Sequence, residues 1–323
     1  MRGDKEAECL DFILKSIFYN KNGKIRLDFD GKAYLDVNEE TFKKWWICYV
    51  NIPHETMFGL TEDDEIEVAC ALRKAKSNDN LNAFPDFVFD NGFIEHFQIT
   101  SSKVTRKGSG QILKEKGFER EVKDKQDKFV EMCNETPSYD KVRSCVSTMK
   151  FPVHSYDYLV QSFTQNCEHH LESLHKYNGA KDIGIFLIEN SETALTMTEN
   201  IFVDWKDGMS HGDLREQQSF NCYRLSRDKN MLNYLYGLRD KLRYVIYVYV
   251  DLVYRKGGTG LEVFDCYEVK KFEIIKIENI PYLLKLLPWD FYIGSKQVTA
   301  ISSMYNISVK GNQGTSGGDN EQT

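Results

Sequence analysis

The segment PDFVFDNGFIEHFQIT, residues 85–100, constrains the fold more than any other part of this 323-residue sequence. Two runs of aromatic and β-branched residues flank Asn91-Gly92. Asn-Gly between such runs is the strongest short-range signal for a tight β-hairpin. The segment therefore predicts a hairpin with strands at about residues 86–90 and 93–100.

The predicted register places two carboxylates on one face of this hairpin. In a two-residue turn at Asn91-Gly92, Val88 faces Glu95, and Asp86 lies one strand step diagonal to Glu95 on the same face. Two carboxylates on an apolar hairpin repel each other unless a cation lies between them. Because hard oxygen ligands suit Mg²⁺ or Mn²⁺, we expect a site for one of these ions at Asp86 and Glu95.

The flanking segments predict an alternation of helices and strands. Thr61 is a good N-cap for an acidic helix, with acids in the first turn where the helix dipole favours them. Apolar residues recur at helical spacing over residues 155–177, and residues 182–190 form a near-continuous apolar run typical of a central strand. Further elements are expected as a mixed-charge helix at 111–132 and a long hairpin at 243–254 and 261–275.

This order of acidic helix, Pro-Asp hairpin, basic loop, helix and apolar strand resembles the core of the PD-(D/E)xK nuclease superfamily. Pro85-Asp86 matches the Pro-Asp element, and Glu95 matches the acid of the Glu-x-Lys motif. The resemblance covers roughly residues 61–190. It implies an α/β (α+β) fold with a restriction-endonuclease-like mixed sheet flanked by helices.

The resemblance also implies roles for further residues. Glu65, or alternatively Glu67, would be the helix carboxylate that assists Asp86 and Glu95. The backbone carbonyl of His96 would be a third metal ligand. In the superfamily the bound ion activates a water molecule and neutralises charge on the scissile phosphate.

The sequence departs from the superfamily in two respects. Phe97 stands where the motif has its lysine. Gln98 points to the opposite face unless a bulge intervenes, and a migrated lysine (Lys103, Lys107 or Lys114) could take the role instead. No strand is evident between the acidic helix and Asp86. The basic loop that follows the hairpin is expected to contact phosphate through Lys103, Arg106 and Lys107.

Domain organisation is predicted from the shifts in pattern along the chain. Residues 1–60 are expected to form a small α+β lead-in, with a hairpin at 24–37 and a helix from Glu39. Residues 61–190 would form the nuclease-like core, 191–309 a sheet-rich C-terminal region, and 310–323 a disordered tail.

Composition limits the classes of partner. The formal net charge is −7, whereas nucleic-acid-binding proteins usually carry a basic footprint, so any such contact must come from a local patch. The eight cysteines show no C-x-x-C spacing, which predicts reduced thiols in a cytoplasmic protein and no zinc site of the usual type. The most apolar run, residues 244–254, is too short to span a membrane.

The resemblance implies metal-dependent phosphodiester hydrolysis of nucleic acid, with DNA favoured over RNA, and by association a restriction or anti-phage defence role. A homodimer or a protein partner is compatible with the sequence. Two alternatives stay open: a catalytically inactive nuclease fold that serves as a binding or regulatory module, and an unrelated α+β interaction protein. His169 and His170, adjacent on one helix, are expected to be structural.

Overall fold

The computed structural model describes most of the chain and divides it into two compact units. Unit 1 comprises Met1–Lys103 and His154–Lys296, and unit 2 comprises Val104–Val153 and Gln297–Thr323. The predicted domain boundaries near residues 60 and 190 both fall inside unit 1, because strands from either side of them join one sheet. The predicted tail lies outside the described residues. Those residues are 3–19, 22–27, 30–49, 57–58, 60–78, 80, 83–105, 108–135, 142–150, 152–203, 213–256, 264–287, 290–295 and 299–307.

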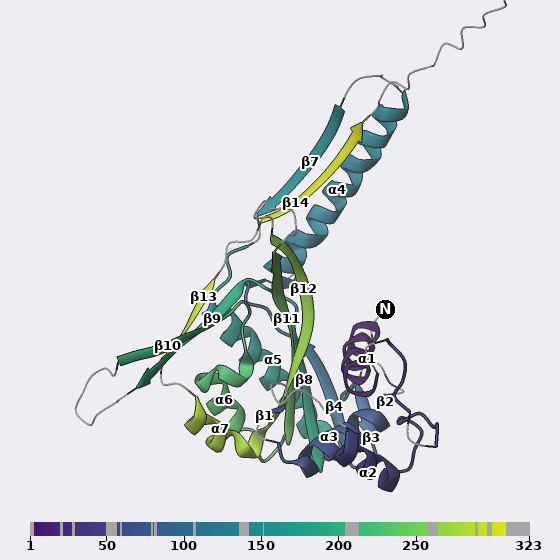
Figure 1. Cartoon of the computed structure of the whole chain (residues 1–323), viewed down its shortest axis with the longest axis vertical. Coiled ribbons are helices and arrows are strands. Elements are labelled where there is room, and N and C mark those ends of the chain that lie inside the picture. Colours follow the sequence, from purple (N-terminus) through teal and green to yellow (C-terminus); the bar gives the residue numbers. More distant parts are fainter. Residues whose placement is uncertain are drawn as a thin grey trace, which may run out of the picture. The chain divides into compact units, whose positions relative to one another are not determined.

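A seven-stranded mixed sheet with the order β1-β12-β11-β8-β4-β3-β2 forms the centre of unit 1 (Figure 1). Strands β4, β8 and β11 run parallel, while β2–β3, β3–β4 and β11–β12 pair antiparallel. The predicted mixed α/β class and the long β11–β12 hairpin are therefore confirmed. The strands are β1 Met57–Phe58, β2 Lys76–Ser77, β3 Phe87–Phe89, β4 Gly92–Gln98, β8 Ile183–Asn190, β11 Tyr244–Lys256 and β12 Phe264–Lys276.

Helices cover both faces of this sheet. The period-two alternation of strand side chains creates two apolar cores: Ile94 and Leu187 join the first, and Phe93 and Phe186 join the second. The first core packs against α1 Asp4–Phe18, α2 Glu39–Tyr49 and α3 Glu62–Lys74. The second packs against α5 Tyr156–Lys176, η2 Leu225–Arg227, α6 Lys229–Tyr236, η3 Ile277–Asn279 and α7 Ile280–Leu286.

The structure confirms only some of the local elements predicted for the first part of the chain. Thr61 caps α3 as predicted: its hydroxyl accepts a hydrogen bond from the Asp64 amide, and the Asp64 carboxylate accepts one from the Thr61 amide. The hairpin predicted at residues 24–37 is reduced, among the described residues, to isolated bridges, one of them Leu27↔Ala33. Gly31 has the positive φ that its turn requires, 78°.

The hairpin at residues 85–100 has a different register from the predicted one. Phe89 pairs with Gly92, and Phe87 pairs with Ile94, so the turn residues are Asp90 and Asn91. Gly92 is required by close packing, because a Cβ there would lie 2.1 Å from the carbonyl oxygen of Ile183. One further pair in this register places Asp86 directly opposite Glu95, where the sequence predicted a diagonal pair.

The remaining strands form smaller sheets. In unit 1, β9 Leu195–Val203 lies between β10 Asp213–Phe220 and β13 Asp290–Ser295, all antiparallel. Unit 2 contains the antiparallel pair β7 Val142–Lys150 and β14 Thr299–Ile307, both in contact with α4 Gly110–Glu135, and the short pair β5 Val104–Thr105 and β6 Gly108–Ser109. Among the described residues, no helix is both long and apolar enough to cross a bilayer.

Candidate functional site

Asp86 and Glu95 are brought together by two hydrogen bonds that cross between neighbouring chain segments. The Asp86 amide donates to Oε2 of Glu95 at 3.0 Å. The amide of His96 donates to Oδ2 of Asp86 at 2.8 Å. Each carboxylate thus accepts a hydrogen bond from a backbone amide of the other segment. Asp86 immediately precedes Phe87, the first residue of β3.

The electrostatics of this pair are unfavourable for two negative charges. Burial, followed by the negative charge of Glu95, raises the pKa of Asp86 to about 6. Glu6 on α1 adds to this effect, while the hydrogen bond from the His96 amide opposes it. Asp86 therefore carries a charge at neutral pH at a cost that a bound cation would relieve.

His170 on α5 completes the contacts of Glu95. Its Nδ1 lies 2.6 Å from Oε1 of Glu95. Its ring stacks on Phe97, with centroids 4.8 Å apart and an interplanar angle of 12°. Phe97, at the position where the superfamily has lysine, thus fixes the plane of a histidine that contacts Glu95.

His170 was expected from the sequence to be structural, and its contact with Glu95 was not predicted. The signal that could have found it is helical spacing. Cys167 and Leu174, both buried on α5, lie three residues before and four residues after His170, which places His170 on the face turned toward the sheet. His169 is exposed.

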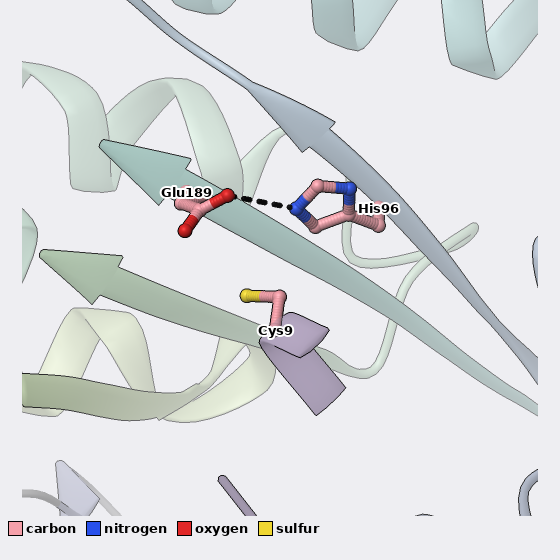
Figure 2. A group of neighbouring side chains, drawn as sticks. All are labelled: Cys9, His96 and Glu189. Atoms are coloured by element: carbon pink, nitrogen blue, oxygen red, sulfur yellow. Dashed lines mark ion pairs between the residues drawn. The ribbon is translucent and has the colours of Figure 1, made fainter. Parts of the chain in front are cut away.

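The side chains of His96 and Gln98 belong to a separate polar cluster on the opposite face of the sheet. Nε2 of His96 lies 3.4 Å from Oε2 of Glu189 on β8 (Figure 2). Gln98 donates to the same oxygen at 2.7 Å, and Nζ of Lys270 lies 2.6 Å from Oε1 of Glu189. Although burial opposes ionisation, hydrogen bonds from these neighbours lower the pKa of Glu189 to about 2. The proposed catalytic role of Gln98 beside Glu95 is therefore replaced by a contact with Glu189.

The carboxylates predicted on α3 have other partners. Oε2 of Glu65 accepts a hydrogen bond from Nε1 of Trp46 at 3.4 Å. Glu67 lies 2.7 Å from Nε of Arg243 and also accepts from the hydroxyl of Tyr244. The helix acid whose charge reaches Asp86 is Glu6 on α1, a helix that the sequence analysis did not identify.

Of the lysines considered as replacements for the motif lysine, the structure describes Lys103, which is exposed, and Lys114. Nζ of Lys114, in unit 2, donates to the carbonyl oxygen of Lys150 at 3.2 Å. Lys107 and Arg106 lie outside the described residues. Within the described chain, the basic side chain with an ion-pair contact to Glu95 is His170.

Glu95 is thus the centre of the candidate site, with Asp86 on the neighbouring segment and His170 on the covering helix. Its two carboxylate oxygens face different partners, which fixes the carboxylate plane. Comparisons with protein families, curated proteins and solved structures found no match to this chain.

Proposed function

We propose that this chain hydrolyses phosphodiester bonds in nucleic acid, with DNA favoured over RNA, using Mg²⁺ or Mn²⁺ held by Asp86 and Glu95. The observation that carries the proposal is the contact between two acids, in which the Asp86 amide donates to Glu95 at 3.0 Å. Burial, followed by the charge of Glu95, raises the pKa of Asp86 to about 6. A half-buried and a buried carboxylate brought together in this way are a common feature of catalytic and metal-binding sites.

The donor set suits a hard divalent ion. Asp86 and Glu95 contribute carboxylate oxygens, and the backbone carbonyl of His96 is a third oxygen donor in the same segment. Oxygen-only sets of this kind favour Mg²⁺ or Mn²⁺ over softer metals. When bound, the ion would lower the pKa of a coordinated water and neutralise charge on the scissile phosphate.

The topology around the pair supports the same proposal. Within unit 1 the chain runs from α3 through the antiparallel strands β2, β3 and β4. The segment Val104–Val153 of unit 2 follows, and the chain then continues in unit 1 with α5 and with β8, which lies parallel to β4. The two-residue strand β2 follows α3 and precedes Asp86, the interval in which no strand was evident from the sequence. This order is similar to the restriction-endonuclease-like core, with β11 and β12 extending the sheet.

We assign His170 the role of the basic group beside the acidic pair. Its Nδ1 contact with Glu95 fixes the carboxylate in one orientation, and stacking on Phe97 fixes the ring. Histidine side chains beside hydrolytic sites commonly serve in proton transfer. A restriction or anti-phage role in the cytoplasm remains part of this proposal.

A binding or regulatory module is the second candidate, favoured by a specific observation. Phe97 is 5% exposed and packs against Phe186 as well as His170, so the place of the motif lysine is apolar and filled. A nuclease fold that had lost its chemistry would retain this kind of packing and still bind nucleic acid or protein.

A cleavage assay separates these two candidates. The full chain is incubated with plasmid, single-stranded DNA and RNA, with Mg²⁺, with Mn²⁺ and with chelator. We expect metal-dependent cleavage that falls by at least 10²–10³-fold, roughly the cost of one preorganised electrostatic group, in Asp86→Asn and Glu95→Gln. The control Asp90→Asn changes an exposed acid of the same hairpin and should cleave normally. Wild-type protein that cuts no substrate with either ion would favour the binding module.

A further inference from the structure

A second cluster of metal-ligating side chains lies on the opposite face of the sheet from Glu95. Cys9 on α1, His96 on β4 and Glu189 on β8 each offer one ligand atom, and these atoms lie within 4.8 Å of one another (Figure 2). All three residues are buried, with exposed fractions of 0%, 7% and 8%. They come from segments about 90 residues apart, which is why no motif spacing revealed them.

One nitrogen in this cluster is incompletely satisfied. Nε2 of His96 is buried, and its contact with Oε2 of Glu189 at 3.4 Å lacks the geometry of a hydrogen bond. Buried polar atoms are almost always paired, so an orphaned imidazole nitrogen in a native fold requires an explanation. A metal ion between His96, Glu189 and Cys9 would use this nitrogen as a ligand.

The spacing agrees with tetrahedral zinc. Nitrogen and oxygen ligands bound at about 2.0–2.2 Å from a tetrahedral ion are roughly 3.3–3.5 Å apart, and a thiolate at about 2.3 Å is roughly 3.6 Å from either. The His96–Glu189 separation of 3.4 Å already has this value. The three ligand atoms lie within 4.8 Å of one another, so each distance from the Cys9 sulfur exceeds the tetrahedral value by at most about 1.2 Å.

The surroundings are those of a supported ligand set. Gln98 and Lys270 contact the two carboxylate oxygens of Glu189 and fix its orientation. The hydrogen bond from the His96 amide to Asp86 holds the backbone of that ligand. Partners of this kind around the ligands are typical of protein metal sites. The mixture of sulfur, nitrogen and oxygen selects zinc or a similar transition ion over Mg²⁺.

We propose that Cys9, His96 and Glu189 form a binding site for zinc or a chemically similar divalent transition ion, separate from the oxygen site at Asp86 and Glu95. The ion connects α1 to strands β4 and β8, and a water molecule takes the fourth tetrahedral position. Because all three ligands are buried, its contribution is to hold α1 on the sheet.

Metal analysis of the full chain tests this site. Protein produced with zinc, and separately with cobalt, is dialysed and its metal content measured. We expect stoichiometric zinc, and for cobalt a thiolate-to-metal charge-transfer band. Cys9→Ser should abolish the band and most of the bound metal. The control Cys167→Ser removes an equally buried cysteine from α5, on the other face, and should retain both.

Two further measurements distinguish loss of the metal site from unfolding of the variant and from failure of the proposed nuclease function. If Cys9→Ser does not fold, chelation of the wild type should lower its melting temperature and zinc should restore it. Glu95→Gln should keep its zinc, because Glu95 is not a ligand of this site. Zinc binding can therefore be present even if the protein has no nuclease activity. Wild-type protein with no bound zinc and no cobalt–thiolate band, or equal metal content in Cys9→Ser, would overturn the proposal.

Discussion

Nδ1 of His170 and Oε1 of Glu95 lie 2.6 Å apart, linking α5 to strand β4. The other oxygen of Glu95 accepts from the Asp86 amide at 3.0 Å, so the carboxylate is held from two directions. Buried carboxylates are costly without such partners. The arrangement keeps a charged group in an apolar sheet and holds it next to a second acid.

Asp86 makes the stability of the metal-free protein depend on pH. Its pKa is raised from 3.8 to about 6 in the folded chain. Between these values the folded chain binds more protons than the unfolded chain, so stability falls as pH rises from about 4 to 6. The full shift corresponds to about 3 kcal/mol, and partial exposure of the side chain reduces the expected cost to roughly 1–2 kcal/mol.

Asp86→Asn removes this cost and keeps an oxygen that can accept from the His96 amide. In chelator at pH 7.5, we expect urea unfolding to show a gain of roughly 1–2 kcal/mol, with no gain near pH 4. Asp90→Asn, with an acid whose side chain is 84% exposed, should show no comparable pH-dependent difference. An equal effect of Asp86→Asn at both pH values would contradict the account.

His170→Ala should affect both stability and activity. The substitution removes one polar partner of the buried Glu95 carboxylate, which should lower the free energy of unfolding by roughly 1–3 kcal/mol. We also expect cleavage to fall by about 10²-fold or more if the group acts at the site. His169→Ala, one residue away and exposed, provides the matched control. Similar behaviour of the two variants would exclude a special role for His170.

Local patterns predicted much of the fold. The Thr61 cap, the amphipathic helix α5 and the apolar strand β8 follow from residue periodicity and end signals, which act within one segment. The hairpin at residues 85–100 was also expected, but its register was not. Gly92 looked like a turn residue, whereas the approach of Ile183 on another strand requires it.

The sequence predicted the proximity of candidate site residues only when those residues are close together in the chain. Asp86 and Glu95 share one hairpin, so their proximity followed from strand geometry. His170 and Cys9 come from distant helices, and no local pattern specifies which strand residues they meet. Gln98 was expected on the face opposite Glu95 unless a bulge intervened. β4 pairs with β8 without a register shift, and Gln98 contacts Glu189 on that opposite face.

The explanation for the register can be tested with two glycines. Gly92→Ala would place a Cβ 2.1 Å from the Ile183 carbonyl oxygen, so β4 and β8 must separate locally. We expect a loss of several kcal/mol, in the range of other overpacked sites, by chemical denaturation. Gly117→Ala, in open space on α4, should instead stabilise its helix by up to about 1 kcal/mol. A neutral Gly92→Ala would show that the close approach does not set the register.

The proposed function requires Asp86 and Glu95 to bind one divalent ion together. A Mn²⁺ titration followed by electron paramagnetic resonance of the free ion measures this binding, in the Cys9→Ser background so that the second cluster does not contribute. We predict one site that is lost in both Asp86→Asn and Glu95→Gln and kept in Asp90→Asn. Undiminished Mn²⁺ binding in both site variants, or no binding in the parent protein, would contradict the claim.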